Sequence, residues 1–177
     1  MDLGVISVRY ARALLKCCVE AKAEDKVYKE MQVLAENYIK VPDLRRTIDN
    51  PMISRDKKVA LLQTAAGGSK ISNITIKLIQ LVLQEGRENI MQFIANSYIT
   101  LYRQQKNITR GKLTTAVPVS SNIESKMRKM VESRTNGTVE FSTEVDPELI
   151  GGFVLEYDTY RMDTSVKTQL NKILKEL

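Results

Sequence analysis

The chain has 177 residues, 43% of them hydrophobic and 27% charged, which is typical of a globular protein with one good-sized domain or two small ones. No run reaches the ~18 apolar residues of a membrane-spanning helix, and the first residues lack the layout of a secretory signal. The composition therefore excludes disordered and collagen-like classes and predicts a protein that starts out in the cytoplasm.

The chain contains no histidine. This absence excludes imidazole-based catalysis, Ser-His-Asp and Cys-His nucleophiles, and nearly all zinc sites. The only cysteines, Cys17 and Cys18, are adjacent on a predicted helix, so their side chains point about 100° apart and suit neither a redox pair nor a metal site. We expect both to be buried small hydrophobes.

The net charge is +6, and the whole excess of basic residues lies before residue 108. Such an excess is compatible with a nucleic-acid-binding face or an anionic membrane surface. Because acidic residues are interleaved with the basic ones throughout, an ordinary solvated helical surface is the simpler interpretation.

Apolar residues recur at helical spacing through the first part of the chain. The segments that we predict as helices are 4–23, 25–40, 43–49, 54–66, 72–84 and 88–106. Pro42 ends the second segment, and Gly67-Gly68 closes the fourth. For 72–84, a strand is the alternative because of the alternation in ITIKL, but the length and the helical neighbours favour a helix.

The first and fifth helical segments carry more apolar surface than a one-sided surface helix needs. In the first, the polar stripe is limited to Arg9, Arg12, Lys16 and Glu20; in the fifth, it is limited to Asn73, Lys77, Gln80 and Gln84. Either both helices are interior, or their spare faces line one shared groove for an amphipathic partner helix.

The periodicity changes after 107–111, the most polar and least periodic stretch, which we predict to be a linker. Alternating residues from Leu113 to Val119 predict a strand, and Pro118 favours an edge position. A helix capped by Ser120-Ser121 follows, and Asn136-Gly137 turns the chain into a strand over 138–145.

The stretch from Asp146 to Leu170 is predicted to contain a hairpin followed by the last helix. Gly151-Gly152 interrupts an apolar run and predicts a bulge or a close backbone approach. Asp158-Thr159 is the predicted tip of a hairpin, and Asp163, Thr164 and Ser165 provide side-chain oxygens for the start of a last helix. The apolar stripe of that helix is Val166, Leu170, Ile173, Leu174 and Leu177.

The predicted fold is mainly α with a small α+β part. A six-helix N-terminal bundle spans 1–106, and a small C-terminal α/β domain spans 112–177, with helices on one face of its sheet. Neither part contains a nucleophile, metal cluster or acid/base pair that spacing alone would identify.

Several short motifs resemble one known family. They are RYARAL at 9–14, Asn50-Pro51 followed by a helix with Lys57-Lys58, EGR at 85–87, TTAVPVS at 114–120, and DPELIGGF at 146–153 with D-x-S-V at 163–166. In this order they resemble the delta subunit of the bacterial rotary ATP synthase, the family of the mitochondrial oligomycin-sensitivity-conferring protein. The chain departs from the family pattern at Asp158-Thr159 and at Thr164.

The resemblance implies a non-catalytic stator subunit, in one copy per complex, that links the catalytic alpha/beta head to the peripheral stalk and resists rotor torque. It implies a groove between the first and fifth helices for the N-terminal helix of an alpha subunit. The matching residues are Tyr10, Ala13, Leu14, Leu78, Leu81 and Val82.

The same resemblance implies that the C-terminal domain meets the C-terminal part of the stalk b subunit. The matching motif residues are Gly151, Gly152, Asp163 and Ser165. It implies no cofactor, no metal and no nucleic acid, and a peripheral place on the cytoplasmic face of the inner membrane, reached only through the complex.

The competing interpretation from the residues alone is a basic helical RNA-binding regulator. Against it, the chain has no tryptophan and only 3 phenylalanines, and it has neither an aromatic-rich strand for base stacking nor a clustered basic stripe.

Overall fold

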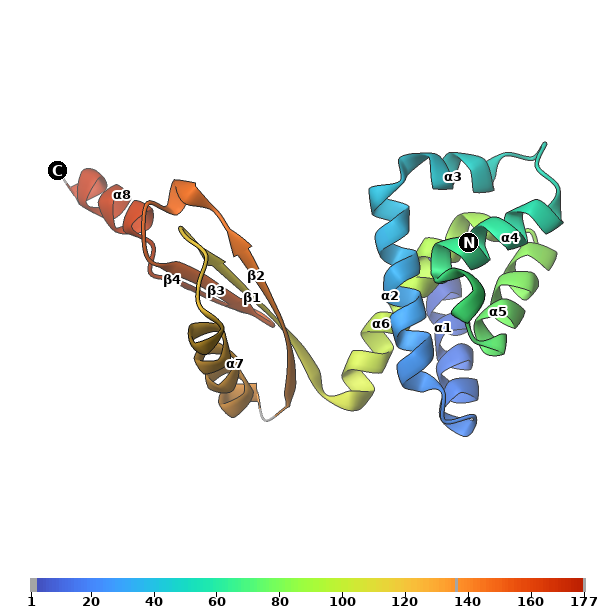
Figure 1. Cartoon of the computed structure of the whole chain (residues 1–177), viewed down its shortest axis with the longest axis horizontal. Coiled ribbons are helices and arrows are strands. Elements are labelled where there is room, and N and C mark those ends of the chain that lie inside the picture. The colour runs from blue at the N-terminus through green and yellow to red at the C-terminus, as the bar shows by residue number, and fades with distance from the viewer. Residues whose placement is uncertain (1–2, 136, 177) are drawn as a thin grey trace. The chain divides into compact units, whose positions relative to one another are not determined.

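The computed structural model describes residues 3–135 and 137–176 (Figure 1). The chain divides into two compact units, Met1–Gln104 and Gln105–Leu177. The first unit is helical and the second contains a small sheet, as the sequence predicts. Asn136 of the predicted turn and Leu177 of the predicted apolar stripe lie outside the described residues.

The described part of the first unit contains the predicted helices. They are α1 (Leu3–Glu20), α2 (Glu24–Lys40), α3 (Pro42–Asp49), α4 (Arg55–Ala66), α5 (Asn73–Gln84) and α6 (Met91–Lys106). Helix α5 settles the choice between helix and strand for 72–84. Pro42 occupies the first turn of α3, where its missing N–H costs no hydrogen bond, and Gly67 ends α4 with a φ of 133°.

The core of the bundle is built around α2, α5 and α6. Helices α3 and α4 each add one large, fully buried side chain to it. The largest fully buried side chains of the bundle include Val27, Met31, Leu34, Ile48, Leu62, Ile79, Ile90, Met91, Ile94 and Tyr98. The end of α6 is also fastened to α2, because the rings of Tyr28 and Tyr102 stack with centroids 4.1 Å apart. Arg103 donates a 2.9 Å hydrogen bond from Nε to the Tyr28 hydroxyl.

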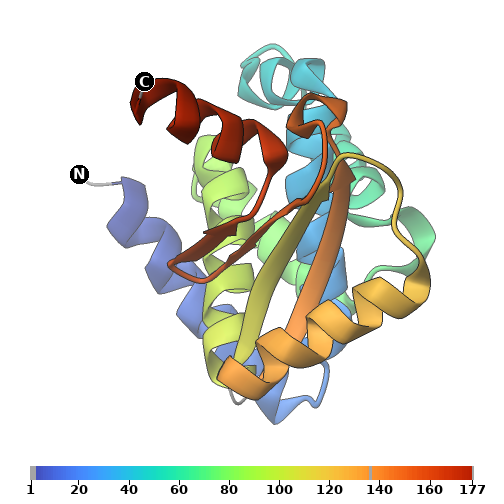
Figure 2. The same cartoon turned by 90° about the vertical axis from the view of Figure 1, so that its left-hand side faces the viewer.

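The second unit is a four-stranded sheet with the strand order β2-β1-β3-β4 (Figure 2). Its elements are β1 (Ile108–Thr115), α7 (Ser121–Thr135), β2 (Thr138–Val145), β3 (Phe153–Tyr157), β4 (Tyr160–Asp163) and α8 (Val166–Glu176). Strands β1 and β2 are parallel, whereas β3 pairs antiparallel with both β1 and β4. Helix α7 is the crossover between the two parallel strands.

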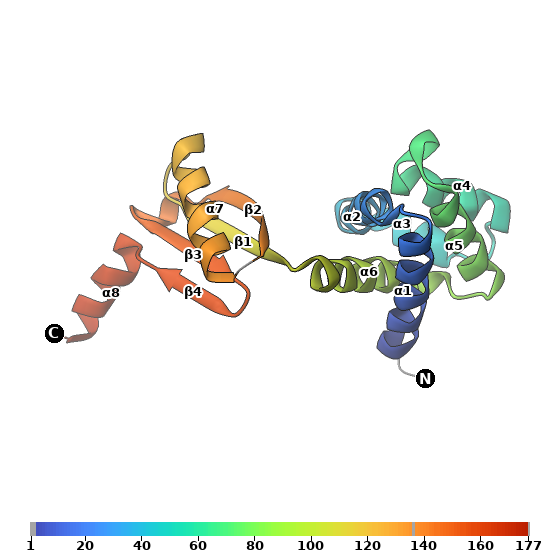
Figure 3. The same cartoon turned by 90° about the horizontal axis from the view of Figure 1, so that it is seen from below.

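One face of this sheet is packed against α7 (Figure 3). Its core consists of Leu113, Val131, Val139, Leu155 and Tyr157. Helix α8 contacts the short 3-10 turn Pro147–Leu149 instead. The expectation that the helices of this unit cover one face of the sheet is therefore correct for α7 and wrong for α8, whose apolar residues Leu170, Ile173 and Leu174 are 47%, 56% and 70% exposed.

Two expectations about the start of the second unit are also wrong. Ile108 to Gly111 of the predicted linker are part of β1. Strand β1 is an interior strand that ends before Pro118, so the predicted edge position is also wrong. The sequence pattern did not identify the start of this strand, because one face of β1 carries charged side chains and the segment therefore resembles a polar loop. Gly111 leaves room for the Phe141 ring, which a Cβ atom there would approach to 2.7 Å.

In the described part of the chain, no helix is long and apolar enough to cross a membrane. Cys18 is buried as expected, but Cys17 is exposed. The two side chains diverge because neighbouring helical residues point about 100° apart.

Candidate functional site

Helix α1 buries only a narrow stripe of residues. Its buried positions are Ser7, Ala11, Leu14 and Cys18, which lie on one face at helical spacing. The rest of its apolar surface remains accessible, and Val5 and Val19 are 56% and 40% exposed. The excess apolar surface predicted from the sequence is therefore present on α1.

Helix α5 packs against α1 and buries most of its own apolar residues. The buried positions are Thr75, Leu78, Ile79, Val82 and Leu83. Leu81 is the large apolar side chain of α5 that remains outside, at 47% exposure. Helix α5 is thus more interior than α1.

The predicted groove residues fall into two groups. Leu14, Leu78 and Val82 are buried, with 6%, 6% and 0% exposure, so they hold the helices in place. Ala13 and Leu81 are exposed and Tyr10 is half-buried, so these three are the predicted residues that a partner can reach. Their contact with a partner remains a prediction.

Tyr10 is held by a residue that follows α5. Arg87 donates a 3.0 Å hydrogen bond from its guanidinium to the Tyr10 hydroxyl, and its Cζ lies 5.8 Å from the ring centroid. This contact fixes the ring between α1 and the end of α5. The EGR motif thereby contributes to the same surface as RYARAL, a connection that spacing along the sequence does not show.

The start of α5 is fixed by the buried carboxylate of Glu30, which is 7% exposed. It accepts hydrogen bonds from the Ser72 backbone N–H at 2.7 Å, from the Ser72 hydroxyl at 2.8 Å, and from the Thr75 hydroxyl. A negative charge at a helix N-terminus interacts favourably with the helix dipole. Glu30 therefore sets the position of the helix that carries Leu81.

A hollow of about 430 Å³ lies between α1 and α6. The lining of the hollow includes Ser7 of α1 and Ser97 of α6, whose hydroxyl oxygens are 3.3 Å apart. The two helices therefore approach closely there. Val8 and Phe93 also line it, and Phe93 is 45% exposed. The sequence analysis did not identify this hollow, since only the packing brings the two helices together.

In the second unit, the glycine pair allows a close approach between two backbone segments. Gly152 has a φ of 74°, and a Cβ atom there would lie 2.3 Å from the Thr164 carbonyl oxygen. A Cβ atom on Gly151 would lie 3.1 Å from the Val166 side chain. The pair precedes β3 rather than forming a bulge within it, so the close backbone approach is the correct alternative.

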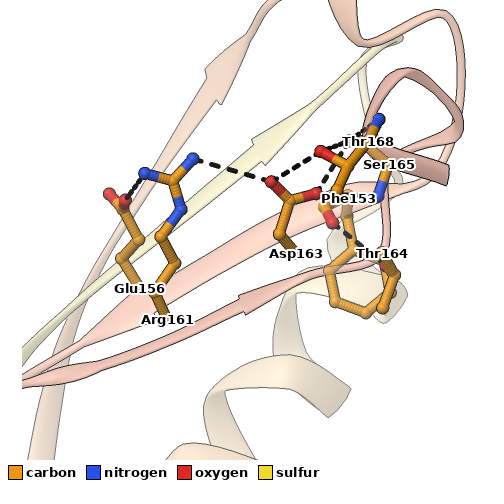
Figure 4. Close-up of polar contacts among 7 residues, drawn as sticks. All are labelled: Phe153, Glu156, Arg161, Asp163, Thr164, Ser165 and Thr168. Carbon is orange, nitrogen blue, oxygen red and sulfur yellow. Dashed lines mark hydrogen bonds and ion pairs between the residues drawn. The ribbon is translucent and has the colours of Figure 1, made fainter. Parts of the chain in front are cut away.

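Asp163 and Ser165 build the start of α8 (Figure 4). The Asp163 carboxylate accepts hydrogen bonds from the Ser165 hydroxyl at 2.7 Å, the Ser165 N–H at 3.0 Å and the Thr168 hydroxyl at 3.0 Å. The Ser165 hydroxyl accepts one from the Thr168 N–H at 3.2 Å, as the predicted N-cap does.

These contacts also affect ionisation. The hydrogen bonds from Ser165, with those from Thr168 and the charge of Arg161, hold the pKa of Asp163 below its ordinary value. Arg161 lies between Glu156 and Asp163, at 3.4 Å and 3.6 Å (Figure 4). The four predicted C-terminal motif residues therefore shape the turn that leads into α8, and a direct role in binding remains a prediction.

An apolar hollow of about 290 Å³ adjoins this turn. Its lining includes Val117, Val119, Ile123, Met127, Ile150 and Phe153. Ile150 is 66% exposed and has a φ of 66°, which is unfavourable for a β-branched residue. Gly151 also lines the hollow, and its carbonyl accepts a 3.0 Å hydrogen bond from the N–H of Val166, the first residue of the exposed apolar stripe of α8. Residues in sparsely populated backbone conformations cluster at functional sites.

Among the described residues, no group of three or more Cys, Asp or Glu side chains is arranged to hold a metal ion. The features that stand out in both units are apolar surfaces on or beside helices. Such surfaces suit protein–protein contact.

Comparison with known proteins shows to which family the chain is similar. A family model described as "ATP synthase delta (OSCP) subunit" matches residues 6–177. The chain is 46% identical to the ATP synthase subunit delta of Phocaeicola vulgatus, across 99% of this chain and 95% of that protein. It is 44% identical to the same subunit of Parabacteroides distasonis, across 98% and 96% of the two chains.

The fold is similar to that of a chain in the cryo-EM structure of the Toxoplasma gondii mitochondrial ATP synthase hexamer, with a TM-score of 0.69 at 19% identity and 96% coverage of both chains. The chain belongs to the ATP synthase delta (OSCP) subunit family.

Proposed function

We propose that this chain is a non-catalytic stator subunit of the proton-translocating ATP synthase, which connects the catalytic alpha/beta head to the peripheral stalk and resists rotor torque. The observation that carries the proposal is that each unit leaves an apolar helical surface open: Tyr10, Ala13 and Leu81 in the first, Ile150 and the α8 stripe in the second. Full-length similarity to delta subunits supports the same function.

For the first unit, the proposed partner is the N-terminal helix of an alpha subunit, which would lie on the α1/α5 surface. Buried Leu14, Leu78 and Val82 would support this surface from below, and the Tyr10 ring would meet the partner in the orientation that Arg87 imposes. Apolar helix-in-groove contacts with a few aromatic and aliphatic anchors can hold a partner without nucleotide or metal.

For the second unit, the proposed partner is the C-terminal part of the stalk b subunit. The apolar hollow and the α8 stripe would provide its contact surface, while Gly151, Gly152, Asp163 and Ser165 would shape it. We further propose that each complex contains one copy of the chain and that this copy is held at the cytoplasmic face of the inner membrane. The RNA-binding alternative finds no support among the relatives described above.

The test uses Leu81→Asp, which places a charge on the α1/α5 surface without disturbing the core. Binding to the alpha/beta head should weaken roughly 10- to 100-fold, or about 1.4–3 kcal/mol, because the new carboxylate must be desolvated in an apolar contact. The measurement is the affinity of the full-length variant for the purified head.

Gln80→Asp is the matched control, since it introduces the same charge at the neighbouring exposed position of α5. It should bind the head as the unaltered chain does. Equal binding by Leu81→Asp, with unchanged helical content, would show that this surface does not receive the head.

A further inference from the structure

Strand β2 forms a sheet edge that is open along its length. Within the described residues it pairs with β1 alone, from Ile108↔Thr138 to Thr115↔Val145 (Figure 2). The opposite edge, β4, has 4 residues against 8 in β2, and it leads through Thr164 and Ser165 into α8. The longer row of unpaired backbone groups is therefore on β2.

Several devices that commonly protect an edge strand are missing from β2. Its sequence, TVEFSTEV, contains no proline, lysine or arginine, and its pairing with β1 is continuous, without a bulge. Ser142 to Val145 are all exposed, and Val145 is 47% exposed. These residues are thus accessible to an added strand.

The one aromatic side chain of β2 does not cover this edge. Phe141 leans over β1, so closely that a Cβ atom on Gly111 would lie 2.7 Å from its ring. Phe141 also packs with the core under α7. The ring is therefore directed away from the outer side of β2.

The two faces of β2 differ in charge. Val139 lies in the α7 core, so Phe141, Thr143 and Val145 share its face, while Glu140 and Glu144 lie on the other. Both carboxylates have neighbours on the inner side: Arg110 of β1 lies directly across from Glu140 in the strand register, and Lys112 of β1 forms an ion pair with Glu144, whose side chain stays 58% exposed. An incoming strand would therefore meet acidic groups on one face and apolar groups on the other.

This charge pattern disfavours a second copy of the chain as the occupant. Two copies can pair antiparallel through their β2 edges, with both α7 helices on the same face of the combined sheet. In the registers with the most paired residues, Glu140 of one copy then lies directly opposite or diagonally beside Glu144 of the other. Like charges at such cross-strand positions are destabilising. A heterologous strand with basic residues at these positions has no such conflict.

We infer that the outer edge of β2 accepts an extended segment of a different protein as an additional strand. Basic side chains of that segment lie opposite Glu140 and Glu144, and its apolar side chains lie on the α7 face beside Val145. Backbone hydrogen bonds provide the affinity, and the alternating side chains provide the specificity. The inference goes beyond the proposed function, because it is a property of the free chain and can be tested without the ATP synthase.

The first test adds a blocked synthetic peptide of alternating lysine and valine to the full chain and follows amide hydrogen exchange. Protection should appear in segment 138–145. A peptide N-methylated on alternate amides should give none, because it cannot complete the strand pairing. Protection spread over other elements, or equal protection by the methylated peptide, would overturn the inference.

Charge variants test the specificity. Glu140→Lys combined with Glu144→Lys should weaken peptide binding about tenfold, since two favourable cross-strand pairs become repulsive. Glu148→Lys makes the same kind of change at a site outside the strand and should bind normally. If the double variant does not fold, Glu140→Gln with Glu144→Gln replaces it; unchanged binding by a folded variant contradicts the proposed recognition.

The second test asks whether the edge is occupied in the assembled complex. Hydrogen exchange of segment 138–145 in the purified ATP synthase is compared with that in the free chain, with helix α3 (Pro42–Asp49) as an internal reference because no partner is proposed for it. Slower exchange in β2 supports a natural strand partner. Equal exchange in both states means that no strand is added there and overturns the inference for the complex.

Discussion

Single residues in this chain serve to bring backbone segments together more than to contact partners directly. Gly152 is the clearest case, because its φ of 74° and its distance to the Thr164 carbonyl exclude a side chain. A substitution there would separate β3 from the turn that leads into α8. The effect on stalk binding would therefore be indirect.

Gly152→Ala should destabilise the second unit by about 2 kcal/mol or more, because it combines backbone strain with a steric conflict. The measurement is the thermal or denaturant transition of that unit. Gly86→Ala is the control, since Gly86 also has a positive φ, of 62°, but open space around it. It should cost only about 1 kcal/mol. Equal losses in the two variants would show that the contact with Thr164 is unimportant.

At the scale of an element, α8 depends on the polar contacts at its first turn. The pKa of Asp163 is held below its ordinary value by hydrogen bonds from Ser165 and Thr168 and by Arg161. A carboxyl group with a lowered pKa in the folded state stabilises the fold above its unfolded-state pKa, and this contribution is lost as the pH falls through the folded-state pKa. The start of α8 should therefore be acid-sensitive.

Asp163→Asn should lower the stability of the second unit by about 1 kcal/mol at neutral pH, in the range typical of a lost helix cap. The difference from the unaltered chain should shrink as the pH falls below the ordinary aspartate pKa of about 3.9 and through the lower pKa that Asp163 has in the folded state. Thermal unfolding of both chains across this range measures the effect. A difference that stays constant with pH would mean that the charge of Asp163 is not what stabilises α8.

At the scale of the whole molecule, the proposed connector has two separate binding surfaces, one on each unit. A substitution on one surface should leave the other functional, because Leu81 and Leu174 lie in different compact units. Loss of either contact should uncouple rotation from proton flow even when the remaining contact persists.

Leu174→Lys should release the stalk while the head remains bound, because it places a charge in the exposed apolar stripe of α8. Leu81→Asp should have the opposite result. Co-purification of head and stalk subunits with each variant measures both contacts at once. Gln169→Lys, an exposed polar position on α8, is the control and should retain both partners. Loss of both partners in either variant would contradict two independent surfaces.

The sequence by itself determined the order and type of most elements and the division into a helical part and a mixed part. Helical periodicity, Pro42 and the cap residues before α8 are local signals, so they can be read without knowledge of distant contacts. The excess apolar surface of α1 was visible for the same reason.

Tertiary structure alone decided which residues are buried and which are open. Leu14, Leu78 and Val82 share the helix faces that the sequence pattern marked, yet neighbouring helices cover them and leave Tyr10, Ala13 and Leu81 accessible. The first half of β1 was missed because an interior strand with one charged face has the composition of a loop until its pairing partners are known. Burial and strand pairing depend on contacts between distant segments, whereas periodicity records only the geometry of neighbouring residues.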